Sequence, residues 1–332
     1  MQHTYAARRH GQAIIYCNIG PEQVGEVVLF LWSARWCKLR MMSTTRPYEP
    51  YLRSPEPYRF AEPFAPPPPV LRQRLWVHIV LFLLTVASTI LVGGWVFSAG
   101  LLSILLAHEF GHYFTAQRYR VPASLPYFIP FPFSLFGTLG AVIRMSPRIP
   151  HRRALFDIAA AGPLAGLVLA IPLTYVGISL STTVRTEALP SNILTLGEPL
   201  LFRSLGWLAH GSLGENTDLM LHPLAFAGWV GMFVTALNLL PIGQLDGGHI
   251  SHAMFGSHSR LVAGAVFGGL AVFSLAQRNF TWVPLLILLF FFGIQHPRLT
   301  DDDQPIGRSR QVLGVVLGLI FAGCFSLVPF RF

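Results

Sequence analysis

Long apolar runs separated by short polar segments dominate the chain after residue 74. A helix of about 20 apolar residues is long enough to cross the hydrocarbon core of a bilayer. Four runs predict spanning helices: Leu75–Phe97, Ala99–Gln117, Ile158–Leu180 and Leu219–Ile242. Three further runs are shorter or end the chain: Leu261–Ala276, Phe280–Ile294 and Val312–Phe330. The pattern predicts an all-α polytopic membrane protein with about six or seven transmembrane helices.

One segment interrupts this helical pattern. Val121–Met145 is rich in aromatic residues, proline and glycine, a composition that favours extended segments and turns over a helix. We therefore expect extended chain that dips back against the protein around Phe136–Gly137–Thr138. The alternative is an amphipathic loop on the lipid surface, because aromatic segments settle readily at membrane interfaces.

The composition also indicates a membrane protein. Hydrophobic residues make up 52% of the chain and charged residues 12%, whereas about 25% of the residues in an ordinary soluble domain are charged. The formal net charge of +9 is mostly explained by arginines that face anionic lipid. The sequence contains no recognisable module for binding nucleic acid.

The distribution of arginine predicts how the helices are oriented. Arginines cluster before the first run and between the second and third, whereas 181–218 contains only Arg185 and Arg203 against four acidic residues. Because Lys and Arg are enriched in cytoplasmic loops, we expect 181–218 to face outward. The second and fourth helices then run in the same direction, and their ends meet toward the cytoplasm. The expected location is a bacterial inner membrane, with the active site toward the cytoplasmic side.

The second run ends in a motif with metal-binding chemistry, the pentapeptide HEFGH. Histidines four residues apart share one face of a helix, so His108 and His112 can offer two imidazole nitrogens to one metal ion, with Glu109 beside them as a general base. A catalytic zinc site has three protein ligands and leaves one position for water, so one more ligand is required. Asp246 is the best candidate, because carboxylates are normal zinc ligands and ionisable residues in membrane segments are costly.

Each motif also has a plainer interpretation. HExxH pentapeptides occur by chance in unrelated helices, and Leu245–Gly248 is ordinary turn sequence. The place of HEFGH at the end of an uncharged run favours the metal site, because ionisable side chains serve no structural purpose in an apolar helix.

Three motifs occur in order on successive predicted helices: HEFGH, AGPLAG at 161–166 and NLLPIGQLDGG at 238–248. Together they resemble the site-2 protease family of intramembrane zinc metallopeptidases, over about residues 75–260. The segments LPYFIP, GTLGA and RRALFD are similar to the branch of bacterial, cyanobacterial and plastid members that lack a PDZ domain.

The resemblance implies specific roles. Zinc would be held by His108, His112 and Asp246, and Glu109 would activate water. A membrane re-entrant β-hairpin would follow the zinc-binding helix, with an edge able to pair with substrate.

Asn238 is a further candidate, for binding substrate. Pro241 and Gly243 should unwind the chain after it, which lets its side chain turn toward the site. Contact with the substrate backbone or an oxyanion is one interpretation, and a helix-capping or interhelical hydrogen bond is the other.

Some polar and small residues on the third helix have a structural interpretation. Gly162 and Gly166 form a small-xxx-small pair that predicts close helix packing without chemistry. Asp157 is expected to be a helix N-terminal or ion-pairing residue.

Three regions are predicted. Residues 1–74 form a Pro-rich, largely disordered cytoplasmic tail, 75–260 the catalytic membrane core and 261–332 the C-terminal transmembrane helices. Met41 or Met42 could be the true start, which would make residues 1–40 an artefact of the gene model.

The predicted function is that of an intramembrane zinc metalloendopeptidase, cutting peptide bonds in or near transmembrane segments. Its cofactor would be Zn²⁺, and its partners transmembrane protein or peptide substrates and the lipid bilayer. The alternatives are a membrane metal-ion carrier and a catalytically silent membrane scaffold. Glu109 separates them, because a carrier needs ligands but no adjacent base.

Overall fold

The computed structural model describes residues 5–9, 12–16, 73–147, 149–185, 194–214, 217–277, 280–292 and 305–331. The described chain is mostly helical, and it contains three stretches long and apolar enough to cross a membrane: Leu75–Arg118, Arg152–Ser179 and Asp246–Ala276. Most of the predicted tail lies outside the described residues, so its true start stays a prediction. Two described parts of it, residues 5–9 and 12–16, form strands, so the predicted disorder does not hold for them.

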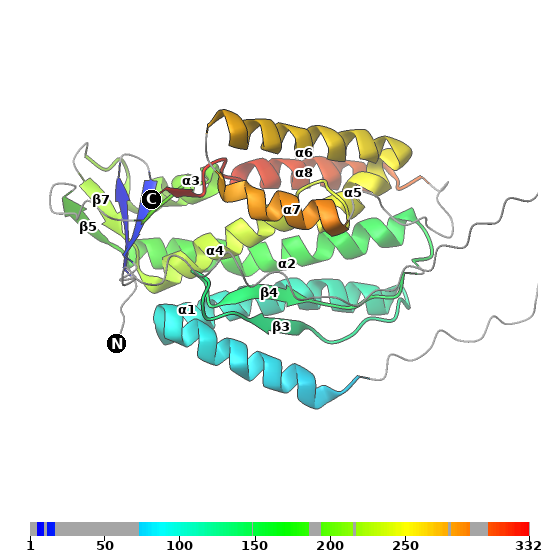
Figure 1. The fold of residues 1–332 in the computed structure, drawn as a ribbon, viewed down its shortest axis with the longest axis horizontal. Coiled ribbons are helices and arrows are strands. Elements are labelled where there is room, and N and C mark those ends of the chain that lie inside the picture. Colours follow the sequence, from blue (N-terminus) through cyan, green and yellow to red (C-terminus); the bar gives the residue numbers. More distant parts are fainter. Residues whose placement is uncertain are drawn as a thin grey trace, which may run out of the picture. The chain divides into compact units, whose positions relative to one another are not determined.

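Helix α1 (Leu75–Arg118) folds back on itself at Gly94 (Figure 1). Gly94 has φ 79° and ψ 176°, a conformation that is essentially restricted to glycine. Thr89 Oγ1 and Ser98 Oγ lie 2.7 Å apart, although nine residues along a straight helix would separate them by about 13 Å. The first two predicted spans are therefore the two halves of one sharply bent element.

The other α-helices of the described chain follow in order: α2 (Arg152–Ser179), α3 (Leu200–His210), α4 (Pro223–Asn238), α5 (Asp246–Phe255), α6 (Ser259–Ala276), α7 (Val283–Phe292) and α8 (Arg308–Cys324). Helix α2 packs against both α1 and α4. Because α2 lies between these helices, 61% of its most apolar stretch is buried inside the protein.

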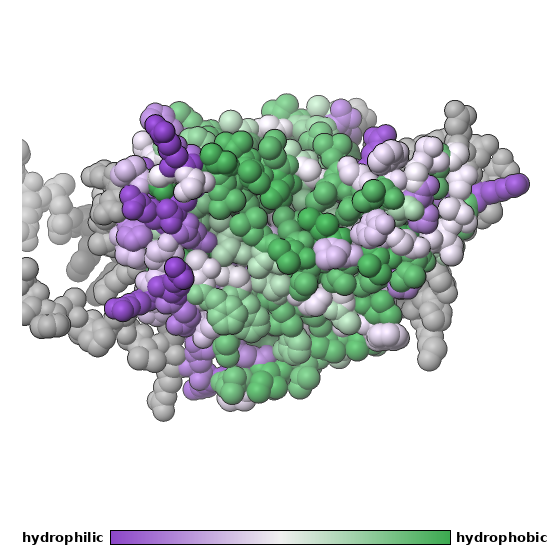
Figure 2. Space-filling model, turned by 180° about the vertical axis from the view of Figure 1, so that it is seen from behind, coloured by the Kyte–Doolittle hydropathy of each residue, from purple (hydrophilic) through white to green (hydrophobic). Residues whose placement is uncertain are grey.

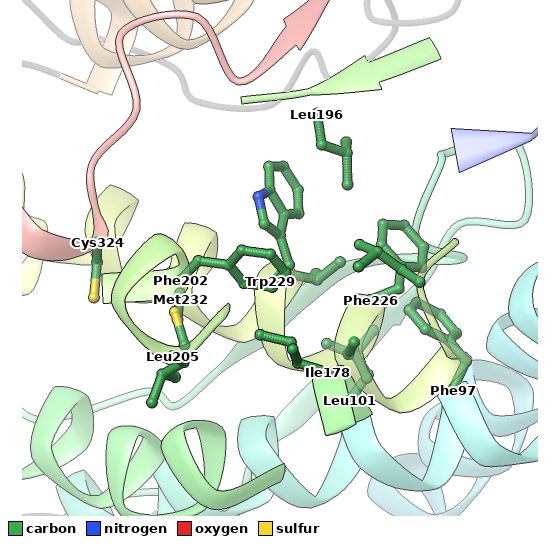
Figure 3. Packing of buried hydrophobic residues seen from close by; sticks show 14 of the residues in the cluster. Phe97, Leu101, Ile178, Leu196, Phe202, Leu205, Phe226, Trp229, Met232 and Cys324 are labelled. Atoms are coloured by element: carbon green, nitrogen blue, oxygen red, sulfur yellow. The ribbon is translucent and has the colours of Figure 1, made fainter. Parts of the chain in front are cut away.

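Large side chains fill the core between these helices. Phe97 and Leu101 of α1 meet Phe226 and Trp229 of α4, and Ile178 closes the cluster from α2 (Figure 3). The rings of Phe97 and Phe226 stack with centroids 5.0 Å apart. Since lipid tails are as apolar as these side chains, close packing rather than a hydrophobic driving force holds such helices together.

Apolar side chains also cover much of the outer surface. Figure 2 shows an apolar band across one face, with hydrophilic side chains gathered toward its two ends. Leu91 is 72% exposed and Leu319 is 68% exposed. Such large exposed apolar area is typical of a surface that contacts lipid.

The segment that follows α1 forms a β-hairpin. Strand β3 (Tyr127–Pro130) pairs antiparallel with β4 (Thr138–Val142), with an irregularity between Phe128 and Pro130. Gly137, at the turn, accepts a hydrogen bond on its carbonyl oxygen from Ser88 Oγ at 2.5 Å, and β3 packs along α1. The expected extended chain against the protein is therefore found, folded onto the first half of α1.

Further strands follow the C-terminal end of α2, where β5 (Thr182–Arg185) pairs with β7 (Thr217–Met220). A second sheet has the strand order β1 (Tyr5–Arg9), β2 (Gln12–Tyr16), β6 (Leu194–Leu196) and β8 (Phe330–Arg331). The all-α description is therefore too simple.

Two of the predicted spans are longer than the helices observed. Leu219 and Met220 belong to strand β7, and the fourth helix runs only from Pro223 to Asn238. The last helix ends at Cys324, before Phe330 enters a strand. Hydropathy alone could not locate these boundaries, because apolar residues lie on both sides of each of them.

Candidate metal centre

Three side chains that can bind a metal converge between α1 and α5. His108 and His112 lie one turn apart on α1, and their Nε2 atoms are 3.1 Å from each other. Asp246, the first residue of α5, places Oδ2 3.3 Å from Nε2 of His108 and 3.2 Å from Nε2 of His112. Among the described residues, these three form a group able to hold a metal ion.

The separations fit one zinc ion. Zinc lies about 2.0–2.2 Å from imidazole nitrogen and carboxylate oxygen, so two ligands at a tetrahedral angle are about 3.3 Å apart. The three donor atoms here are separated by 3.1 to 3.3 Å. Two imidazoles and one carboxylate are also a normal donor set for catalytic zinc, with a fourth position left for water.

The cluster is buried. His108 is 3% exposed, Glu109 6% and His112 5%. Burying several ionisable groups among apolar helices is costly unless they pair with one another or hold an ion. The burial therefore supports a functional cluster, with the Glu109 carboxylate in the same apolar surroundings as the two imidazoles.

The connection between α4 and α5 carries Asp246 to the histidines. Helix α4 ends at Asn238, and residues 239–245 turn before α5 begins, with Gly243 at φ 59°. A Cβ added at Gly247 would overlap the carbonyl oxygen of Leu239, so the tight approach of the two segments requires glycine. The predicted unwinding of this segment is confirmed.

Helix α2 forms one wall of the site. A Cβ at Gly162 would overlap the imidazole of His112, and one at Gly166 would lie 3.3 Å from Cβ of His108. The interpretation of these glycines as packing residues was correct but incomplete, because it missed that the packing partners are the two candidate ligands. The AGPLAG motif, which contains both glycines, was the feature of the sequence that could have pointed to this wall of the site.

A backbone carbonyl of α2 sets the tautomer of His112. Nδ1 of His112 lies 2.8 Å from the carbonyl oxygen of Ile158. A carbonyl only accepts hydrogen bonds, so Nδ1 is the donor and carries the proton. Nε2 of the neutral ring then presents its lone pair toward Asp246, which is the form that binds a metal. No side-chain motif in the sequence points to this contact.

Asn238 also reaches the cluster. Its Nδ2 atom lies 3.1 Å from Nε2 of His108, so the last residue of α4 borders the place where a metal would lie. The structure thus brings together all five residues singled out from the sequence, namely His108, Glu109, His112, Asn238 and Asp246. Their individual roles stay predictions.

Two histidines and an aspartate that could hold a metal ion, with a glutamate next to one histidine, lie on apolar helices of membrane length, an arrangement typical of a membrane metallopeptidase. The profile of Peptidase family M50 matches residues 96–275 of this chain. The match covers more than half of the chain, which therefore belongs to peptidase family M50, the site-2 protease family. The resemblance inferred from the three motifs is confirmed.

Curated relatives agree with this assignment. The chain is 36% identical over 242 residues to "Probable zinc metalloprotease EGY1, chloroplastic" of Oryza sativa subsp. japonica, covering 69% of this chain and 40% of the relative. It is 37% identical over 231 residues to the protein of the same name from Arabidopsis thaliana, covering 67% and 41%. "Probable zinc metallopeptidase EGY3, chloroplastic" of Arabidopsis thaliana is 32% identical over 247 residues, covering 69% and 42%.

The relatives bear on the other predictions to different degrees. Their names support zinc as the cofactor and peptide hydrolysis as the chemistry. The chain spans about two fifths of the length of these relatives. Their names place them in chloroplasts, so the expectation of a bacterial inner membrane gains no support. No solved structure matches the chain.

Proposed function

We propose that this chain is an intramembrane zinc metalloendopeptidase that hydrolyses peptide bonds in or near transmembrane segments of other proteins. One observation carries the proposal: Nε2 of His108, Nε2 of His112 and Oδ2 of Asp246 lie 3.1 to 3.3 Å from one another, between helices of membrane length. Membership of peptidase family M50 and the names of the relatives support the same activity.

The chemistry divides between the metal and Glu109. His108, His112 and Asp246 would hold the zinc ion, which supplies a Lewis acid that polarises a carbonyl and lowers the pKa of water. Glu109 accepts the proton of the attacking water on a carboxylate oxygen and then passes it to the leaving amine. The protonated Nδ1 of His112 stays bonded to the Ile158 carbonyl, which keeps the ring in one orientation.

Asn238 is proposed to bind the substrate at the scissile bond. Its Nδ2 lies against Nε2 of His108, an atom whose lone pair is taken up when a metal is held. The amide is then released to donate to a substrate carbonyl or to the oxyanion that develops from it, which is the position such a donor needs.

We further propose that the β3–β4 hairpin is re-entrant in the membrane and receives the substrate. A transmembrane helix hides its peptide bonds in internal hydrogen bonds, so a substrate must unwind locally before hydrolysis. An extended substrate segment can satisfy its freed backbone groups by adding to a strand edge. The hairpin follows the zinc-binding helix directly and packs on the first half of α1, which supports this role.

The proposed topology has six or seven spans in a multi-pass membrane protein, with the core at 75–260 and additional helices at 261–332. The site faces the arginine-rich side of the membrane, which would be the cytoplasmic side by the distribution of charge. The two halves of α1 count as separate spans because each is long enough to cross at about 1.5 Å per residue.

The decisive variant is Glu109→Gln in the full chain reconstituted in lipid. Because glutamine keeps the size of the side chain but cannot accept the proton, we expect zinc content to be retained and cleavage of a model transmembrane substrate to fall by at least about a hundredfold. His112→Ala should lose both bound zinc and cleavage of the substrate. His258→Ala, which changes an exposed histidine, should retain bound zinc and cleavage.

The same preparations test the alternative of a metal carrier. Zinc flux into vesicles that is unchanged in Glu109→Gln, together with no cleavage by the wild-type protein, would favour a carrier over a peptidase. Cleavage at the wild-type rate by Glu109→Gln would remove the proposed mechanism.

A further inference from the structure

A half-buried ion pair lies next to the backbone that contacts His112. Arg310, in the first turn of α8, donates from Nε to Oδ1 and from Nη2 to Oδ2 of Asp157, both at 2.7 Å. The hydroxyl of Tyr119, the residue that caps α1, donates to Oδ2 of the same carboxylate. One aspartate on α2 is therefore held from two other elements, α1 and α8.

The geometry of this contact makes it strong. The guanidinium meets the carboxylate side-on through two parallel hydrogen bonds, the arrangement that gives an arginine–carboxylate pair both strength and direction. The side chains of Arg310 and Asp157 are only 29% and 24% exposed, so water screens the pair less than it would at an open surface.

The ion pair adjoins the residue that orients His112. Asp157 directly precedes Ile158, whose carbonyl oxygen lies 2.8 Å from Nδ1 of His112. Any rotation or shift of this turn of α2 moves that carbonyl, and with it the ring that presents Nε2 to the site. Tyr119, just past the end of α1, lies seven residues after His112. The Asp157 carboxylate therefore links the end of the helix that carries His112 to the helix whose carbonyl contacts its ring.

The third candidate ligand depends on the same part of α2. A buried apolar cluster joins Leu155 and Ala159 of α2 to Ile250 of α5 and Leu317 of α8. Helix α5 begins with Asp246. Helix α5 therefore packs on α2, and α8 joins the same apolar cluster through Leu317.

We propose that Asp157, held by Arg310 and Tyr119, is a positioning residue for the metal site. It keeps the first turns of α2 in the one arrangement that orients His112 and supports the helix of Asp246. The C-terminal helix α8, which lies outside the residues matched by the family profile, thereby contributes to metal affinity without touching the metal. The inference rests on the zinc site proposed above.

Metal affinity of the full-length protein tests this directly. Outer residues that orient a metal ligand typically change affinity by about 10- to 100-fold when they are replaced. We expect Arg310→Ala and Asp157→Asn each to weaken zinc binding about tenfold or more in competition with a chelator. The control is Arg308→Ala, which removes the same charge from an exposed position on the same helix and should bind zinc like the wild type.

A spectroscopic measurement separates positioning from simple stability. With Co²⁺ in place of zinc at saturating concentration, Arg310→Ala should alter the visible absorption bands, because the ligand geometry is disturbed in the folded, loaded protein. Arg310→Lys keeps the charge but loses the two-point contact, and it serves in the same way if the alanine variant does not fold.

The outcomes are distinct. Wild-type zinc affinity and an unchanged Co²⁺ spectrum in a folded Arg310 variant would overturn the positioning role and leave the zinc site intact. Zinc binding by the wild type that His112→Ala does not reduce, or no zinc binding at all, would overturn the proposed zinc site and this inference with it.

Discussion

Helix α2 and the first half of α1 differ in how firmly the protein holds them. The most apolar stretch of α2 is 61% buried, and the helix contacts α1, α4 and α5. In the first half of α1, by contrast, Leu83 is 58% exposed and Leu91 is 72% exposed. The first half of α1 is also held by hydrogen bonds to the β-hairpin segment. Such bonds stabilise it only weakly, because hydrogen bonds between membrane helices contribute about 0.6 kcal/mol each on average.

The difference indicates a division of labour. The candidate metal site is built against α2, the more buried of the two, and any shift of α2 would disturb packing on several sides. The proposed substrate-binding hairpin is attached to the helix that faces lipid, where movement costs least. Changes in α2 should therefore affect metal binding, and changes where the β-hairpin contacts the first half of α1 should affect substrate binding alone.

The largest effect is expected for Gly162→Ala. The new Cβ would overlap the imidazole of His112, so the ring must leave its position and the proposed metal ligand is displaced. Zinc affinity should fall by at least about a hundredfold, measured by chelator competition, and peptidase activity should fall with it.

The matched control for this change is Gly264→Ala on α6. Apart from its own turn of helix, no atom of the described residues lies within 4 Å of a Cβ built there, and alanine favours the helix by up to about 1 kcal/mol. The Gly264→Ala variant should bind zinc with the wild-type affinity, and its melting temperature should be equal to or higher than that of the wild type. If Gly162→Ala also kept zinc, the wall formed by α2 would not be what orients His112.

A smaller effect is expected where the first half of α1 meets the β-hairpin segment, for Gln73→Ala. Gln73 precedes α1, donates to the carbonyl of Ala123 at 3.2 Å and accepts from the backbone N–H of Leu125 at 3.1 Å. Losing both bonds costs about 1–2 kcal/mol, which loosens the start of the hairpin. The KM for a transmembrane substrate should rise up to about tenfold, while zinc affinity stays unchanged.

Gln311→Ala removes the same amide from an exposed position on α8 and should change neither quantity. Loss of zinc from Gln73→Ala would contradict the separation of the two regions, and an unchanged KM would contradict a role of the hairpin in substrate binding.

Sequence could predict the parts of this structure that depend on local spacing. The positions of His108 and His112 on one helical face follow from their separation, and the unwinding before Asp246 follows from Pro241 and Gly243. The orientation inferred from arginine then brought the two motifs to the same side of the membrane.

The contacts that support the site could not be predicted in this way. The carbonyl of Ile158 belongs to the backbone and leaves no mark on residue type. Arg310 and Asp157 are far apart in the chain, and an arginine near a helix end is equally typical of the membrane surface. Leu219 and Met220 were assigned to a helix because hydropathy does not distinguish an apolar strand from the helix that follows it.

The most direct test of the central claim is to locate zinc by anomalous scattering at the zinc absorption edge in crystals of the full-length, metal-loaded protein. The account predicts one ion about 2.0–2.2 Å from Nε2 of His108, Nε2 of His112 and a carboxylate oxygen of Asp246. An ion bound elsewhere, or an Asp246 carboxylate directed away from the two imidazoles, would contradict it.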